Sequence, residues 1–231
     1  MLKTLRQDWF APSCVLCEAV SDNPLSLCIA CQQDLPWLLH ACEHCALPLE
    51  DRSKAVCLQC QINPPVFDRA YCALHYSAPV DYLIKRMKFS HQLSHAKVLG
   101  SLLAQQLAQR EINSVDAILP VPLHSARLRK RGFNQSLELA HGLLQSFDIP
   151  LLKGVERIVN TTAQTLVKDG GRERNVRDAF SMKSGGVLPR HVAILDDVIT
   201  TGSTSNELAR LLKDSGVTKV SVWAVARATT H

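Results

Sequence analysis

The clearest feature of the hydrophobic pattern is an apolar run that ends on two acidic residues. Residues 192–195 are all apolar, and Asp196 and Asp197 follow them directly. Because no polar residue interrupts the run, it predicts a strand buried on both faces, as in a parallel sheet. A polar loop then leads into residues 205–213, where apolar positions recur at helical spacing, and Gly216 is the expected end of that helix. The pattern therefore predicts a strand, a polar loop and a helix in that order.

The loop between this strand and this helix has the composition of a phosphate site. It consists of small hydroxyl residues around one glycine, namely Thr200, Thr201, Gly202, Ser203 and Thr204. Such a loop can direct several backbone N–H groups at one phosphate, and the dipole of the following helix adds to the attraction. The carboxylates of Asp196 and Asp197 can accept hydrogen bonds from the hydroxyls of a sugar attached to that phosphate. Together these residues predict a ribose-5-phosphate site.

Strands and helices alternate through the rest of the second part of the chain. Apolar strands are predicted near 69–76, from residue 117 onward and over 219–225, and a long helix is predicted over 80–109. The alternation predicts an α/β fold with a doubly wound parallel sheet, whose ligand lies at the carboxyl ends of the strands. Three basic residues in the long helix are interpreted as a solvated face rather than as contacts of the anionic ligand: Lys85, Arg86 and Lys88.

Cysteine is the most unusual component of the composition. Eight of the nine cysteines form four Cys-x-x-Cys pairs: Cys14/Cys17, Cys28/Cys31, Cys42/Cys45 and Cys57/Cys60. Two such pairs complete one tetrahedral site for a structural Zn²⁺, so four pairs predict two zinc ions. The spacing suits two consecutive ribbons, and an interleaved arrangement is the alternative connectivity. Disulfides and iron–sulfur clusters are the alternative chemistries, and a reducing compartment disfavours the disulfides.

Two histidines and the ninth cysteine lie outside these pairs. His40 and His44 stand beside the cysteine pairs, but eight thiolates already fill two zinc sites, so both are interpreted as bystanders. Cys72 lies in an apolar run and is expected to be a small buried residue. The cysteine-rich region has few large apolar side chains, and a structural Zn²⁺ would contribute folding free energy on the order of 10 kcal/mol.

A domain boundary is expected near Asn63-Pro64-Pro65, between a double zinc ribbon of residues 1–66 and an α/β domain of residues 67–231. The first part carries four Lys/Arg and seven Asp/Glu, and the second carries twenty-two and fourteen, so the net charge of +5 divides into −3 and +8. A zinc ion with four thiolates adds a formal charge of about −2 to each ribbon. The basic surface that could attract phosphates therefore belongs to the α/β domain.

The densest group of cations follows the strand predicted at residue 117. Its members, with the four residues that come after them, are Arg127, Arg129, Lys130, Arg131, Gly132, Phe133, Asn134 and Gln135. Like charges at this density repel one another unless an anion is near, so the stretch predicts a loop that binds pyrophosphate or nucleic acid. The ring of Phe133 could stack on a base or pack beneath the loop. A solvated basic loop without a ligand is the alternative.

Two parts of this sequence resemble the type I phosphoribosyltransferases. The apolar strand, the acidic pair and the Thr-Thr-Gly-Ser-Thr loop resemble the segment that binds phosphoribosyl pyrophosphate (PRPP) in those enzymes. This segment, the four cysteine pairs and the Arg-Lys-Arg-Gly-Phe-Asn-Gln stretch together resemble the ComF/GntX family over nearly the whole chain. The resemblance implies a type I phosphoribosyltransferase-like domain preceded by a small zinc-ribbon domain.

The resemblance also implies roles for particular residues. The 5-phosphate of Mg²⁺-PRPP would lie at residues 200–204, the ribose hydroxyls at the acidic pair and the leaving pyrophosphate at the basic stretch. The residues implied in catalysis are Asp196, Asp197, Arg129 and Arg131. A long excursion after residue 160 would close over the reacting centre, and the residues that the resemblance picks out in this interval are Gln164, Arg174, Asn175 and Phe180.

At the level of function, the resemblance implies the handling of imported single-stranded DNA, in natural transformation or in the use of DNA as a nutrient. The implied partners are PRPP, single-stranded DNA and proteins of the DNA-uptake machinery. An orthodox phosphoribosyltransferase with an unidentified acceptor is the alternative, because the sequence reveals neither an acceptor base nor a nucleophile with a clear partner. A PRPP-sensing regulator is a third hypothesis, which requires a partner surface.

Some function classes are disfavoured by what the sequence lacks. No apolar run approaches the ~20 residues of a membrane span, and residues 1–10 lack the apolar core of a signal peptide, so a cytoplasmic location is expected. Neither a Gly-x-x-x-x-Gly-Lys loop nor a Gly-x-Gly-x-x-Gly turn occurs. The phosphate site is therefore neither a Walker A loop nor a dinucleotide turn.

Overall fold

The structure is a computed structural model of the 231-residue chain. It describes residues 12–21, 23, 25–89, 92–110, 112, 114–160, 178–183 and 187–229. The predicted loop residues Gln164, Arg174 and Asn175 lie outside the described residues.

A parallel sheet of four strands forms the centre of the fold. Its strands are β1 (Arg69–His75), β2 (Ala117–Pro120), β5 (His191–Ile199) and β6 (Lys219–Arg227), in the spatial order β1-β6-β5-β2. All three strand pairings are parallel. The two central strands are buried along almost their whole length, which explains why their sequences are apolar runs without alternation.

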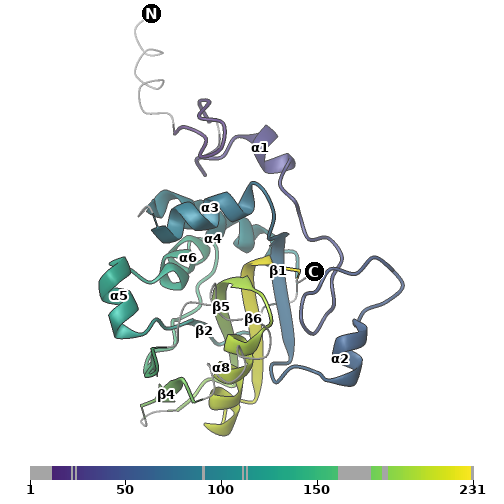
Figure 1. The fold of residues 1–231 in the computed structure, drawn as a ribbon, viewed down its shortest axis with the longest axis vertical. Coiled ribbons are helices and arrows are strands. Elements are labelled where there is room, and N and C mark those ends of the chain that lie inside the picture. Colours follow the sequence, from purple (N-terminus) through teal and green to yellow (C-terminus); the bar gives the residue numbers. More distant parts are fainter. Residues whose placement is uncertain are drawn as a thin grey trace, which may run out of the picture.

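Helices cover both faces of this sheet (Figure 1). On one face lie α3 (Val80–Phe89), α4 (Leu93–Leu107) and α6 (Gln135–Leu143), and their apolar side chains share a core with Leu195 of β5. On the other face lies α8 (Ser203–Asp214), in a second core that contains Ile194. Neighbouring residues of β5 therefore point into opposite cores, as the pleat of a strand requires. The predicted α/β fold with a doubly wound parallel sheet is confirmed.

The backbones of α4 and α6 approach each other closely. A Cβ atom added to Gly100 would lie 2.4 Å from the carbonyl oxygen of Leu139, and one added to Gly142 would lie 2.9 Å from that of Lys97. Only glycine fits at such a crossing, because real Cβ contacts are longer. This contact sets the position of α6 against the sheet, and the first turn of α6 reaches Asp196 at the carboxyl end of β5.

The cysteine-rich segment contains the short helices α1 (Ile29–Gln33) and α2 (Leu58–Ile62). The part with α1 lies beyond α3 and α4, and the part from residue 36 to α2 lies along the outer edge of β1 (Figure 1). The N–H of Leu38 donates to the carbonyl of Ala73 at 2.9 Å, and the N–H of His75 donates to that of Pro36 at 2.8 Å. The segment thereby satisfies backbone groups that an open sheet edge would expose.

Several boundaries differ from the predicted ones. The helix predicted over 80–109 is two helices, since α3 ends at Phe89 and α4 begins at Leu93. β5 continues beyond the acidic pair because Val198 and Ile199 still pair with β6. The helix after the polar loop begins at Ser203, two residues before the predicted start.

The basic stretch is also different from its prediction, because it is a helix and not a loop. Helix α5 covers Ser125–Arg131, and Gly132, with φ 83°, ends it in the left-handed conformation typical of helix C-termini. Arginine, lysine, leucine and alanine are all good helix formers, which accounts for the outcome. In Figure 1, α5 lies next to β2, at the edge of the sheet opposite β1.

A second, small sheet pairs β3 (Val155–Arg157) with β4 (Phe180–Met182) in antiparallel fashion. It borders the carboxyl end of the main sheet through Arg157, whose side chain is described below with the site. Among the described helices, none has both the length and the apolar content that crossing a bilayer requires.

Candidate functional site

The acidic pair forms the centre of the candidate site, near the carboxyl end of β5. Asp197 is only 4% exposed, and its carboxylate forms an ion pair with the ammonium group of Lys88 in the last turn of α3. The carboxylate of Asp196 accepts hydrogen bonds from the hydroxyl of Ser136, at 3.3 Å, and from the backbone N–H of Asp197, at 2.9 Å. Three separate elements, α3, α6 and β5, therefore meet at these two carboxylates.

The two carboxylates have different pKa values because their surroundings differ. Burial raises the pKa of Asp196 to about 8, and the neighbouring charge of Asp197 adds to this effect. Burial also opposes the ionisation of Asp197, but the charge of Lys88 outweighs it and keeps the pKa of Asp197 below its usual value. Two adjacent carboxylates with one cation thus hold one negative charge and one proton at neutral pH.

The position of Lys88 corrects one interpretation of the sequence. Lys88 was expected on a solvated face of the helix, but it contacts Asp197 inside the site. Burial acts to lower the pKa of Lys88, and the charge of Asp197 reverses this and raises it. The expectation holds for Lys85, whose exposed ammonium pairs with Asp81 at 2.7 Å, one helical turn away.

The predicted phosphate loop connects β5 to α8. Gly202 has φ 79°, a left-handed conformation that strains other residues, and it is the N-cap of the twelve-residue α8. The hydroxyls of Thr201 and Ser203 are 2.8 Å apart, and the N–H of Asn206 donates to the carbonyl of Gly202 at 2.8 Å. The first N–H groups of a helix lack partners within it, so this loop can present them to an anion. The loop starts three residues after the acidic pair.

Helix α5 divides the four predicted cations into two sets. Arg127 and Arg131 are four residues apart, on one face of the helix, and both are partly buried, whereas Arg129 and Lys130 are exposed. The guanidinium of Arg131 lies 5.8 Å from the ring centroid of Phe89, in the residue next to Lys88. Burial lowers the pKa of Arg131, and the nearby charge of Asp197 acts in the opposite direction. Arg131 therefore faces the acidic pair, and the exposed cations extend the basic surface outward.

The residues after α5 have structural partners. The side chain of Asn134 accepts from the N–H of Ser136 at 3.0 Å, which caps α6, and donates to the carbonyl of Val121 at 3.0 Å. Gln135 is buried and accepts a hydrogen bond from Arg131. The ring of Phe133 is partly buried. These contacts fix the backbone that carries Ser136 toward Asp196.

One cation of the site was not found from the sequence. Arg157, in β3, stacks on the ring of Phe180 in β4 with 5.3 Å between the guanidinium carbon and the ring centroid. Burial lowers its pKa, Arg127 adds to this decrease and Asp196 opposes it, so Arg157 lies in the field of both groups. The sequence around Arg157 has no motif or periodicity that would have indicated this position.

The cysteines form two separate groups of four. One contains Cys14, Cys17, Cys28 and Cys31, and the other contains Cys42, Cys45, Cys57 and Cys60, and within each group all sulfur atoms lie within 4.8 Å of one another. In each group one pair of sulfur atoms is 3.7 Å apart, and none of the nine cysteines forms a disulfide. Four thiolates at about 2.3 Å from a tetrahedral zinc are roughly 3.8 Å from one another, so both groups fit Zn²⁺.

This grouping decides the connectivity that the sequence left open. The two groups are consecutive along the chain and not interleaved, and among the described residues no histidine joins either of them. Burial alone would raise the pKa of Cys42, but hydrogen bonds from the backbone N–H groups of Cys57 and Cys45 lower it to about 7. Cys72 is buried outside both groups, and burial raises the pKa of its thiol to about 12.

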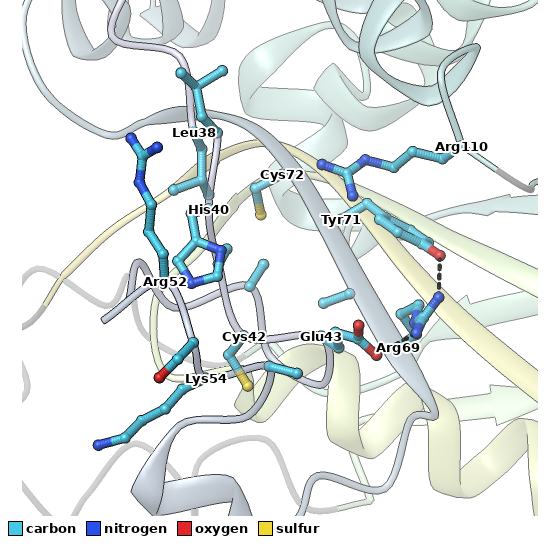
Figure 2. Close-up of a pocket in the computed structure, with 16 residues that line it drawn as sticks. Leu38, His40, Cys42, Glu43, Arg52, Lys54, Arg69, Tyr71, Cys72 and Arg110 are labelled. Carbon is cyan, nitrogen blue, oxygen red and sulfur yellow. Dashed lines mark hydrogen bonds and ion pairs between the residues drawn. The ribbon is translucent and has the colours of Figure 1, made fainter. Parts of the chain in front are cut away.

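Two hollows adjoin the second cysteine group, and neither is lined by the acidic pair. The smaller one, about 290 Å³, lies between this group and β1, where the guanidinium groups of Arg69 and Arg110 flank the ring of Tyr71 (Figure 2). Arg69 is itself paired with Glu43 at 2.5 Å. The larger hollow, about 770 Å³, lies between the second cysteine group and the phosphate loop.

We expect the purified protein to contain two zinc ions per chain, because each cysteine group fits one tetrahedral ion. Cys14→Ser and Cys57→Ser should each reduce the content to one, since their cysteines belong to different groups. Elemental analysis of the three proteins measures this. Iron with visible absorbance, or a single variant that loses both ions, would contradict two independent zinc sites.

Comparison with known proteins agrees with this arrangement. Residues 7–61 match the family described as the double zinc ribbon domain. Competence protein F of Haemophilus influenzae is 37% identical over 209 residues, which cover 87% of this chain and 90% of that protein. The DNA utilization protein YhgH of Salmonella typhimurium is 34% identical over the same shares of both chains. Competence protein ComFC of Streptococcus pneumoniae is 26% identical over 80% of this chain and 81% of that protein.

Among solved structures, a purine phosphoribosyltransferase from Pyrococcus horikoshii Ot3 matches 62% of this chain and 85% of its own. Its TM-score is 0.35 and its sequence identity is 20%, and this similarity is too low to assign the fold. The alignments with the sequence relatives cover more of the chain, since they include both the cysteine-rich part and the α/β part. The chain therefore belongs to the family of competence protein F and the DNA utilization protein YhgH.

Proposed function

We propose that this protein binds Mg²⁺-PRPP at the carboxyl end of β5 and acts in the handling of imported single-stranded DNA. The observation that carries the first part is the acidic pair with Lys88, three residues before a glycine-centred loop at the N-terminus of α8. Family membership supports the second part, because its relatives are named for competence and for DNA utilization.

The acidic pair is suited to a ligand that carries several hydroxyl groups. Ribose hydroxyls can donate to Asp196 and Asp197, and such charge-assisted hydrogen bonds are stronger than those between neutral groups. Binding would displace the ammonium of Lys88 from Asp197, which leaves it close to the phosphates of the ligand. The 5-phosphate would meet the N–H groups of the loop around Gly202, at the positive end of the dipole of α8.

The inward face of α5 is suited to the pyrophosphate. Arg127 and Arg131 lie on that face, and Arg157 approaches it from β3. Several fixed cations in a partly buried site stabilise negative charge that develops as a leaving group departs. Mg²⁺ enters this proposal as part of the substrate, bound to its pyrophosphate.

An orthodox phosphoribosyltransferase is the second candidate function. The partly buried positions of Arg127 and Arg131 favour it, because fixed cations beside the pyrophosphate can stabilise the negative charge that increases on it as it leaves. The exposed cations of α5, Arg129 and Lys130, favour the DNA-handling function, because they face solvent where a nucleic-acid backbone has access.

Replacement of either acidic residue should weaken PRPP binding. Asp197→Asn removes a charged acceptor, and Asp196→Asn removes an acceptor that ionises when the ligand binds. We therefore expect each to weaken the binding free energy by about 1.5–3 kcal/mol, or roughly 10- to 150-fold in Kd. Calorimetry with Mg²⁺-PRPP measures this, and Asp148→Asn, at an exposed acid outside the site, is the matched control. A parent protein that shows no binding at millimolar PRPP would contradict a working site.

PRPP binding should also release a proton from Asp196. With a pKa of about 8 this carboxyl is mostly protonated at pH 7, and hydroxyl donors favour its ionised form. Affinity should therefore increase as pH rises from about 6 to 8 and level off above that range. Calorimetry in buffers of different ionisation enthalpy counts the protons. The Asp196→Asn variant serves as the control for protons that come from PRPP itself, and equal proton release in both proteins would refute the assignment.

Binding of single-stranded DNA should depend on salt through the cations of α5. A single-strand site releases about 0.7 counterions per phosphate neutralised, so replacing all four by Ala should flatten the slope of log affinity against log salt by up to about 3. The exposed pair, Arg129 and Lys130, should affect DNA alone, whereas the inward pair should affect both DNA and PRPP. Titrations of a labelled oligonucleotide at several salt concentrations test this. If the parent protein does not bind DNA even at low salt, the DNA-handling function is contradicted and the orthodox transferase is favoured.

A further inference from the structure

We infer that Arg227 is a positioning residue that couples the second cysteine group to the phosphate loop, so that PRPP affinity depends on the second zinc ion and not on the first. This inference rests on the proposed function, because it concerns the same loop. Arg227 is the last residue of β6, opposite Ile199 in the register with β5, and only 8% of it is exposed.

One guanidinium group contacts both structures. Its Nε donates to the backbone carbonyl of Cys45, a member of the second cysteine group, at 2.9 Å. Its Nη1 donates to the carbonyl of Ile199 at 3.1 Å and also to the carbonyls of Thr200 and Ala228. Thr200 is the first residue of the phosphate loop, so one planar guanidinium group connects a residue of the second cysteine group to that loop.

The contact with Thr200 determines how the loop presents its backbone. In a trans peptide the C=O and the following N–H point in opposite directions. The carbonyl of Thr200 points at Arg227, so the N–H of Thr201 points away from it. A loop N–H turned away from the protein interior is the kind of group that binds a phosphate. Loss of the guanidinium, or a shift of its anchor at Cys45, would release this peptide to rotate.

Two further contacts join the loop region to the segment that follows the second group. The N–H of Val66 donates to the side chain of Asn206, in the first turn of α8, at 2.8 Å. The ring of Phe67 lies beside Gly202, 3.8 Å from where a Cβ would be. These contacts and Arg227 surround the larger hollow, whose walls include Cys45, Cys57 and Cys60.

The first cysteine group has different neighbours. Cys14 belongs to the core on the other face of the sheet, with α3, α4 and α6, and Gln32 of α1 contacts Gln105 of α4 at 3.0 Å. Among the described residues, no hydrogen bond or ion pair links this group to residues 199–204. The two groups therefore provide a matched pair, since both would hold one zinc but only one is connected to the loop.

The test compares the loss of each zinc. Cys60→Ser should weaken Mg²⁺-PRPP binding roughly tenfold, a coupling of ordinary size, whereas Cys17→Ser should change it less than twofold. Arg227→Met should reproduce the loss while zinc content stays at two per chain, and Arg227→Lys should recover part of it. Equal effects of the two cysteine variants, or no effect of either, would overturn the inference.

A second readout separates this inference from the proposed function. Hydrogen exchange of the amides in residues 199–203 should accelerate in Cys60→Ser and Arg227→Met but not in Cys17→Ser, with or without PRPP. If the parent protein failed to bind PRPP, the proposed function would fail, while this exchange pattern would still support the coupling. Unchanged exchange in a folded Cys60→Ser protein that has lost one zinc would overturn the coupling itself.

Discussion

Two adjacent carboxylates, one of them almost completely buried, are the constraint on which the rest of the site depends. They cannot both be ionised in this position without compensation, because burial disfavours charge and each carboxylate repels the other. Lys88 compensates one charge, and Asp196 keeps its proton and accepts a hydrogen bond from Ser136. The protein provides only part of the hydrogen bonds and charges that these carboxylates require. A ligand that provides the rest therefore gains binding free energy. The packing of α3 and α6 on the sheet brings Lys88 and Ser136 to these carboxylates.

The cysteine-rich segment contacts both the central sheet and the loop of the candidate site. It satisfies the edge of β1 through the backbone of residues 36–38, and it reaches the phosphate loop through Cys45 and Arg227. A zinc-stabilised ribbon is well suited to both tasks, because its folding free energy comes from the metal and does not require a large apolar core. In this chain a double zinc ribbon lies beside residues 199–203, and the contacts of Arg227 with Cys45 and Thr200 give a physical link between the two.

The sequence predicted those features that depend on local pattern. Uninterrupted apolar runs indicated the parallel strands, the spacing of the Cys-x-x-Cys pairs indicated two groups of four cysteines, and Gly202 among hydroxyl residues indicated the turn between β5 and α8. It did not predict partners that tertiary structure alone brings together: Lys88 with Asp197, Ser136 with Asp196 and Arg227 with Cys45. The sequence of an amphipathic helix does not show whether the ammonium of Lys88 is solvated or contacts the carboxylate of Asp197, 109 positions later. The density of charge in the basic stretch led to the prediction of a loop. Its residues are good helix formers, however, and they form α5, which ends at Gly132.

The central claim is that the acidic pair and its loop form a PRPP site held ready by Lys88. A crystal structure of the protein with Mg²⁺-PRPP tests this claim most directly. The expected result has the ribose hydroxyls on Asp196 and Asp197, the 5-phosphate at the N-terminus of α8 and the ammonium of Lys88 displaced from Asp197. A complex in which PRPP binds elsewhere, with the ion pair between Lys88 and Asp197 intact, would contradict the claim.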